Sequence, residues 1–159
     1  MKDKIKYLVM DVDGTLTDGK IHIGHEGEIF KTFSCKDGLA IQDILPKTDI
    51  IPVIITGRNS KILENRCKEL RIEKCYQGIR NKTAVLDEVL AGQYTYENVA
   101  YIGDDLNDLP CMETVKTNGG LIGCPADAAK EVIAIADFVS AKDGGNGAVR
   151  EFIEWLLQK

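Results

Sequence analysis

The chain has 159 residues, of which 44% are hydrophobic and 28% are charged, and its formal net charge is −5. This length suits a single domain, residues 1–159, with a core large enough to need no disulfide or metal support. The acidic balance, without a basic stripe, argues against a nucleic-acid partner. No apolar run approaches the roughly 20 residues that a membrane-spanning helix needs.

The cysteines give an expectation about the redox compartment. Their number is odd, and no pair has the C-x-x-C spacing of many metal and redox sites; they are Cys35, Cys67, Cys75, Cys111 and Cys124. The first six residues lead directly into a strand-like run, so we expect no signal peptide. These features together predict reduced thiols in a cytoplasmic protein.

Short apolar runs alternate with helix-like segments along most of the chain. The runs expected to form strands are Tyr7–Met10, 50–55, Val99–Ile102, 121–122 and Phe138–Val139. The segments expected to form helices are 59–70, Lys82–Leu90, 106–115, 126–134 and 148–157. Strands separated by helices predict an α/β fold with a doubly wound, mainly parallel, Rossmann-like sheet. Such sheets bind ligands at the carboxyl ends of their strands.

Residues 20–33 interrupt this alternation. Ile21 and Ile23 alternate with polar residues, a glycine-containing turn follows, and Ile29 and Phe33 continue the apolar pattern. This pattern predicts a β-hairpin inserted after the first strand. Near the other end, the Gly-Gly-Asn-Gly stretch at 144–147 is a candidate hinge that would let the last segment cover a site.

Two aspartates follow the first predicted strand directly. Asp11 and Asp13 are two residues apart, so their side chains point the same way if the extended geometry persists. The alternative is a solvated turn, which Asp and Gly both favour. A calcium loop of the EF-hand type is excluded, because its sixth and twelfth positions would be Leu16 and His22. The remaining interpretation of the two aspartates is a site that holds a hard cation beside a nucleophilic carboxylate.

Three further pieces lie at strand ends or helix starts. An acidic cluster, Gly103-Asp-Asp-Leu-Asn-Asp108, follows the strand at 99–102, Thr56-Gly57 follows the strand at 50–55, and Lys82 opens a helix. Each motif alone is weak evidence for a binding site, because a Thr-Gly pair often caps a helix and a single lysine is often solvated. The order of all these motifs along the chain is stronger evidence for a functional site than any one of them.

These motifs resemble those of the haloacid dehalogenase superfamily of phosphotransferases. The resemblance rests on Asp11-Val-Asp-Gly-Thr-Leu-Thr17, Thr56-Gly-Arg58, Lys82 and Gly103–Asp108, which occur in the order of that superfamily. The intervals between them hold a hairpin, two helices and a short strand, and leave no room for a cap domain. The chain therefore resembles the capless 3-deoxy-D-manno-octulosonate 8-phosphate phosphatase subfamily. Related members are nonulosonic acid 9-phosphate phosphatases and a carboxy-terminal domain of some sialic acid cytidylyltransferases.

The resemblance implies a magnesium-dependent phosphatase with an aspartyl-phosphate intermediate. It makes Asp11 the nucleophile and a ligand of Mg²⁺, and Asp13 the general acid and base, with its backbone carbonyl on the metal. Asp104 becomes the other carboxylate ligand. Asp105 and Asp108 are expected to orient ligand waters or the lysine.

The resemblance also implies a phosphate-binding set. Thr56, with the backbone N–H groups of Gly57 and Gly14, is expected to hold the phosphoryl oxygens. Lys82 is expected to neutralise charge beside the nucleophile, and so to count among the catalytic residues.

The substrate end of the site has weaker candidates. Arg58 and Arg66 could bind a carboxylate in fork geometry, although Glu64 and Glu69 could instead hold them in surface ion pairs. In the resembled subfamily a homotetramer supplies the wall that a cap would give, so the hairpin is the expected assembly element. A neighbouring subunit would complete the pocket, and Lys36 is a candidate for the substrate carboxylate.

Alternative functions can be weighed against the same residues. The resemblance favours a phosphorylated 2-keto-3-deoxy sugar acid, octulosonate 8-phosphate first and a nonulosonate 9-phosphate as the alternative. A non-catalytic assembly domain should have lost Asp11, Asp13 or Lys82, and a receiver domain lacks the D-x-D-G-T motif. A cysteine phosphatase needs C-x5-R, whereas Arg80 follows Cys75 one residue too soon.

Overall fold

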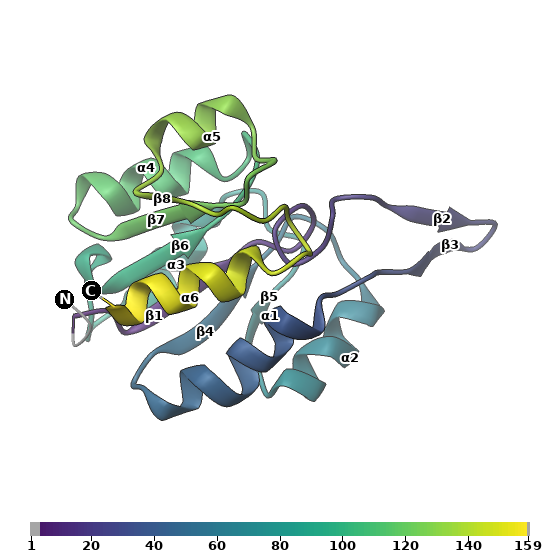
Figure 1. Ribbon diagram of the computed structural model, residues 1–159, viewed down its shortest axis with the longest axis horizontal. Helices are drawn as coiled ribbons and strands as arrows, with labels where there is room; N and C mark the ends of the chain where they lie inside the picture. Colours follow the sequence, from purple (N-terminus) through teal and green to yellow (C-terminus); the bar gives the residue numbers. More distant parts are fainter. Residues whose placement is uncertain (1–3, 159) are drawn as a thin grey trace.

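The centre of the molecule is a six-stranded sheet in which every pairing is parallel (Figure 1). The computed structural model describes residues 4–158; residues 1–3, on which the expectation of a missing signal peptide partly rests, lie outside this range. The strand order is β5-β4-β1-β6-β7-β8. The strands are β1 Tyr7–Met10, β4 Ile51–Ile55, β5 Lys74–Tyr76, β6 Val99–Ile102, β7 Leu121–Cys124 and β8 Phe138–Val139. The predicted doubly wound parallel sheet is confirmed.

Helices cover both faces of this sheet. They are α1 Cys35–Leu39, which continues through a π-helical turn and a 3₁₀ turn to residue 47, then α2 Lys61–Leu70, α3 Lys82–Leu90, α4 Leu109–Thr117, α5 Lys130–Ile135 and α6 Ala148–Gln158. A 3₁₀ turn at Tyr96–Asn98 leads into β6. Within residues 4–158, none of these helices has the length and apolar character needed to cross a membrane.

Three helices begin later than the sequence predicts, and local hydrogen bonds explain two of the shifts. The helix expected from residue 59 begins at Lys61, because the Ser60 hydroxyl caps it by accepting a bond from the Leu63 N–H. The helix expected from 106 begins at Leu109, because Asp108 binds backbone N–H groups upstream and holds a turn there. The helix expected from 126 begins at Lys130.

Alternate side chains of β1 divide the core into two halves. Leu8 and Met10 pack on the face covered by α1, α2 and α6, whereas Tyr7 and Val9 pack on the face covered by α3, α4 and α5. All four side chains are buried, as a strand with helices on both faces requires. The sequence of β1 is a continuous apolar run because both faces of the strand are covered by helices.

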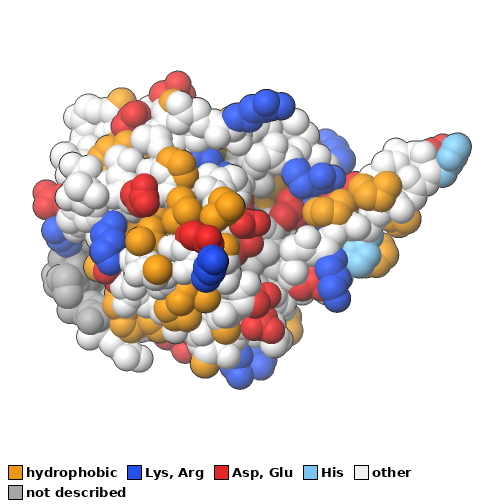
Figure 2. All heavy atoms as spheres, turned by 90° about the horizontal axis from the view of Figure 1, so that it is seen from above, with side chains coloured by type: hydrophobic (Ala, Val, Ile, Leu, Met, Phe, Trp, Pro, Cys, Tyr) orange, Lys and Arg blue, Asp and Glu red, His pale blue; other side chains and the backbone are white. Residues whose placement is uncertain are grey.

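The hairpin forms a second, antiparallel sheet of two strands, β2 His22–Gly24 and β3 Gly27–Phe30. It projects from the body as an arm (Figures 1 and 2). Three large apolar side chains lie exposed on it: Ile23 at 61%, Ile29 at 60% and Phe30 at 48%. The predicted hairpin within 20–33 is confirmed, and its exposed apolar surface is unusual for a monomeric protein.

The glycine stretch at 144–147 is packed, which corrects its expected role as a hinge. The Gly145 N–H donates to the Thr15 carbonyl at 3.0 Å, and a Cβ on Gly144 would lie only 1.9 Å from the Gly14 carbonyl oxygen. Glycine is therefore required for the close approach of the two loops. The segment that follows, α6, buries Phe152 completely and belongs to the core instead of forming a mobile cover.

Replacing Phe152 with alanine tests this assignment of α6. Its ring stacks against Trp155 and lies 5.7 Å from the Phe138 ring, so the substitution removes buried aromatic contacts and leaves a cavity. We expect the free energy of unfolding to fall by about 3–5 kcal/mol in chemical denaturation. Leu39→Ala, at a side chain 45% exposed, is the matched control and should lower it by less than about 1 kcal/mol. A Phe152→Ala protein as stable as the control would contradict the packing.

Candidate active site and metal centre

A cleft of about 280 Å³ opens at the carboxyl ends of the strands. From β1 the chain proceeds outward to β4 and β5, then returns to β6 on the other side of β1. This reversal places the crevice between the ends of β1 and β6, where doubly wound sheets bind ligands. The cleft is lined by Asp11, Asp13, Gly19, Ile21, Thr56, Gly57, Arg58, Asp105 and Asn107.

A buried lysine joins the two strand ends beneath this cleft. The Lys82 ammonium, at the first residue of α3, donates to Asp11 Oδ1 at 2.8 Å and to Asp108 Oδ1 at 2.7 Å. Its side chain is only 2% exposed. Burial alone would lower the pKa of Lys82, but the charges of Asp11 and Asp108 outweigh burial and raise it. The lysine therefore stays charged over the physiological range.

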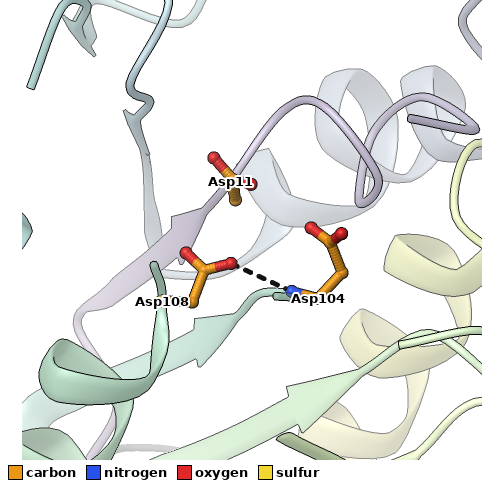
Figure 3. A group of neighbouring side chains, drawn as sticks. All are labelled: Asp11, Asp104 and Asp108. Atoms are coloured by element: carbon orange, nitrogen blue, oxygen red, sulfur yellow. Dashed lines mark hydrogen bonds between the residues drawn. The ribbon is translucent and has the colours of Figure 1, made fainter. Parts of the chain in front are cut away.

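Asp108 is enclosed by hydrogen-bond donors. One carboxylate oxygen accepts from Lys82 and from the Tyr101 hydroxyl at 2.8 Å, and the other accepts from the backbone N–H groups of Asp104 at 3.0 Å and Asp105 at 3.3 Å. Oxygens of Asp11, Asp104 and Asp108 lie within 4.8 Å of one another (Figure 3). Asp108 nevertheless has its oxygens committed within the protein, so we assign it to holding the loop and the lysine.

Asp11 and Asp104 have the chemistry of a cation site. Burial and the charge of Asp108 raise the pKa of Asp11 to about 6, against the opposing effect of Lys82. Burial and the charge of Asp11 raise the pKa of Asp104 to about 8, although the Thr15 hydroxyl donates to it at 2.9 Å. Two carboxylates this close repel each other, and a divalent cation between them would relieve that repulsion. The pair fits a magnesium ion.

Gly14 is required for the close approach of two loops of the site. Its φ is +95°, and a Cβ at this position would lie 2.0 Å from Asp104 Oδ2, so only glycine lets the two loops meet. Its N–H donates to the Thr17 hydroxyl at 3.2 Å. In this structure that N–H holds the loop, and the phosphate-binding role expected of Gly14 stays a prediction.

Asp13 lies in the same cleft but contacts a different set of charged residues. Its Oδ1 accepts from the Lys31 ammonium at 2.5 Å, and its Oδ2 lies 3.9 Å from Nε of Arg58. Glu28 contacts both cations, at 3.1 Å from Lys31 and 3.7 Å from Arg58. The sequence reasoning missed Lys31 and Glu28, because both lie on the hairpin and no local pattern indicates which way the hairpin folds back.

The remaining predicted residues divide into two groups. Thr56, Gly57, Arg58 and Asp105 line the cleft, as expected. Thr56 is held there by its backbone, since its N–H donates to the Tyr76 carbonyl at 2.9 Å and its own carbonyl accepts from Ile79 at 3.0 Å.

Lys36 and Arg66 do not line this cleft. Lys36 is exposed on α1 and borders a separate surface hollow with Lys142 and Arg150. Arg66 pairs with Glu69 at 2.8 Å, the alternative noted for it above, and its guanidinium lies 5.4 Å from the Phe33 ring centre. Their role as substrate-binding residues stays a prediction.

Comparisons with known proteins agree with this geometry. No family model matches the chain. The chain is 45% identical over 156 residues to the 3-deoxy-D-manno-octulosonate 8-phosphate phosphatase of Escherichia coli K12, covering 98% of this chain and 80% of the relative.

Two solved structures of such phosphatases superpose closely. The one from Yersinia pestis has a TM-score of 0.90 at 42% identity and covers 99% of this chain and 83% of its own. The one from Moraxella catarrhalis, in complex with magnesium, phosphate and KDO, has a TM-score of 0.90 at 38% identity, with coverages of 99% and 88%.

The raised pKa of Asp104 predicts how the metal-free protein responds to pH. A carboxyl whose pKa rises from 3.8 unfolded to about 8 folded binds its proton more tightly in the folded state. Stability contributed by that proton is therefore lost as pH rises across this window. We expect Asp104→Asn to melt like the wild type near pH 4 and several degrees higher at pH 9, in thermal unfolding with a chelator present.

Asp105→Asn is the matched control, because that neighbour is exposed and its substitution should give no such pH-dependent gap. A constant difference between wild type and Asp104→Asn at every pH would contradict the carboxylate repulsion.

Proposed function

The chain belongs to the 3-deoxy-D-manno-octulosonate 8-phosphate phosphatase family, and we propose on this basis that it hydrolyses 3-deoxy-D-manno-octulosonate 8-phosphate with the help of Mg²⁺. The observation that carries the proposal is the carboxylate pair of Asp11 and Asp104, with Lys82 bound to the first of them. The Moraxella relative, with its magnesium, phosphate and KDO, supports the same metal and sugar acid here. We infer that residues 1–159 form one catalytic domain without a cap.

Asp11 and Asp104, with the backbone carbonyl of Asp13, would hold the metal. When bound, Mg²⁺ supplies positive charge that offsets repulsion between a carboxylate and a phosphate dianion. Asp11 is the nucleophile and forms an aspartyl-phosphate. The Lys82 ammonium keeps one of its oxygens fixed at 2.8 Å, so the attacking carboxylate has a defined orientation.

The other cleft residues act on the phosphoryl group and the leaving group. Asp13 protonates the departing sugar oxygen, then takes a proton from the water that attacks the aspartyl-phosphate. The Thr56 hydroxyl and the N–H groups of Gly57 and Gly14 hold phosphoryl oxygens. Asp108 fixes Lys82 and the 104–108 turn, and Asp105, at the edge of the cleft, orients water.

Substrate recognition extends beyond one chain in this proposal. Arg58, whose side chain is 45% exposed and lines the cleft, binds the sugar carboxylate in this proposal. Lys36 and Arg66 lie elsewhere on the surface, so we propose that they act at the cleft of a neighbouring subunit in a homotetramer. The exposed apolar arm of the hairpin, seen in Figure 2, is the assembly element. With five cysteines free of disulfides, we propose a cytoplasmic enzyme.

Replacing Asp11 with asparagine tests the nucleophile. The amide nearly preserves shape but cannot form an acyl phosphate, so kcat should fall by roughly 10⁴-fold or more while the circular dichroism spectrum stays unchanged. The assay measures phosphate released with Mg²⁺ from octulosonate 8-phosphate, a nonulosonate 9-phosphate and hexose phosphates. Octulosonate 8-phosphate should be hydrolysed fastest.

Asp18→Asn is the control, because Asp18 is exposed and its Oδ1 shapes the turn by accepting from the Lys20 N–H, which asparagine can also do. Magnesium-dependent turnover by Asp11→Asn would refute the nucleophile. Equal and poor hydrolysis of all three ester classes would refute the sugar-acid substrate and leave the phosphatase chemistry standing.

Replacing Phe30 with aspartate tests the assembly. A charge on the arm opposes burial of the apolar surface between subunits, so the tetramer expected from light scattering should dissociate, and octulosonate 8-phosphate hydrolysis should fall with it. Val139→Asp, at a side chain 44% exposed on the last strand, is the matched control and should stay tetrameric. A fully active wild-type monomer would contradict the proposal.

A further inference from the structure

The base of the hairpin is tied to the cleft by a group of four charged side chains. Lys31 and Glu28 come from the hairpin, and Asp13 and Arg58 come from the ends of β1 and β4. The group holds two positive and two negative charges. Its two hairpin members are well enclosed, with side-chain exposures of 2% for Lys31 and 13% for Glu28.

Such burial requires compensation. An ammonium at 2% exposure is costly unless anions and acceptors surround it, and here Asp13 at 2.5 Å and Glu28 at 3.1 Å provide them. Glu28 is in turn anchored to the body, because its other oxygen accepts a bond from the Ser60 hydroxyl. Ser60 also caps α2, so the chain of contacts runs from a rigid helix start through the hairpin to Asp13.

These contacts also give the hairpin a defined position. A two-stranded hairpin is marginally stable by itself, and this one exposes apolar side chains along its arm. The Lys31 and Glu28 contacts join it to the same residue that the proposed mechanism uses as general acid and base. The base of the hairpin therefore reaches the cleft of its own chain, whereas its exposed apolar side chains lie along the arm.

We propose that Lys31, held by Glu28, is the positioning residue of Asp13, and that it directs proton transfer to Asp13 Oδ2. The inference rests on the proposed phosphatase function. Lys31 occupies Oδ1 by donating to it, while Oδ2 lies 3.9 Å from Arg58. Asp13 itself lines the cleft. The oxygen left for the reaction is thus Oδ2.

The two proton transfers then balance at this one atom. The proton on Oδ2 passes to the bridging ester oxygen as the P–O bond breaks and its electron pair stays on the leaving sugar oxygen. In the second step Oδ2 takes a proton from water as the water oxygen bonds to phosphorus and the bond from phosphorus to Asp11 breaks. Asp13 ends protonated again, and the net reaction is hydrolysis of one ester.

The leaving group distinguishes positioning from mere support of the fold. A sugar alkoxide needs a proton from Asp13 to depart, whereas p-nitrophenolate departs without one. For Lys31→Met we expect kcat/KM, which reports the steps up to leaving-group release, to fall roughly 10²-fold on octulosonate 8-phosphate. On p-nitrophenyl phosphate it should fall less than about 10-fold, since general acid catalysis contributes little there.

Matched variants complete the experiment. Lys31→Arg keeps the charge and its two acceptors and should recover most of the sugar-phosphate activity, while Glu28→Gln should show a weaker form of the Lys31→Met effect. Lys20→Met and Glu26→Gln, at exposed hairpin positions, should match the wild type. Equal losses of kcat/KM on both substrates in Lys31→Met would overturn the proposal and assign Lys31 to the fold alone.

A crystal structure of Lys31→Met provides a readout that does not depend on activity. The Asp13 carboxylate should leave its wild-type position, turning toward Arg58. An unmoved Asp13 would overturn the positioning role. If the wild type hydrolyses neither ester, the proposed function fails, and the position of Asp13 in this crystal structure still decides whether Lys31 orients it.

Discussion

The rest of the site depends on one buried ammonium group. Lys82 binds Asp11, directly after β1, and Asp108, directly before α4, so it joins the segments that follow the two central strands β1 and β6. Removing its charge would leave two buried carboxylates uncompensated, a loss on the order of 3–5 kcal/mol. Because Asp108 also binds the N–H groups of the 104–108 turn, the same contact fixes where Asp104 lies.

The charges at the cleft form two separate groups around this contact. Lys82 compensates Asp11 and Asp108, and the repulsion between Asp11 and Asp104 suits a metal. Lys31 from the hairpin and Arg58 from the loop after β4 compensate Asp13. Asp11 and Asp13, although only two residues apart, therefore have different surroundings. Asp11 contacts a buried lysine and lies at the cation site, whereas Asp13 contacts the hairpin and lines the cleft.

The sequence predicts the site best where functional residues directly follow a strand. The apolar runs predicted β1, β4 and β6, and the motifs after them predicted that Asp11, Thr56 and the 103–108 cluster meet at one edge.

What the sequence could not predict are contacts between distant segments. The direction in which the hairpin folds brings Lys31 to Asp13, and the close approach of Asp104 requires glycine at position 14. The later start of α4 has a local cause, because the Asp108 carboxylate binds the backbone N–H groups of Asp104 and Asp105 and holds a turn there.

The most direct test is to locate the phosphoryl group on the protein. Enzyme mixed with octulosonate 8-phosphate and Mg²⁺ is quenched in acid within one turnover and reduced with borohydride, which converts an aspartyl-phosphate to homoserine. Peptide mass spectrometry then reads the modified position. We expect homoserine at position 11 alone; homoserine at position 13 or 104 in place of 11 would contradict the assignment of Asp11 as the nucleophile.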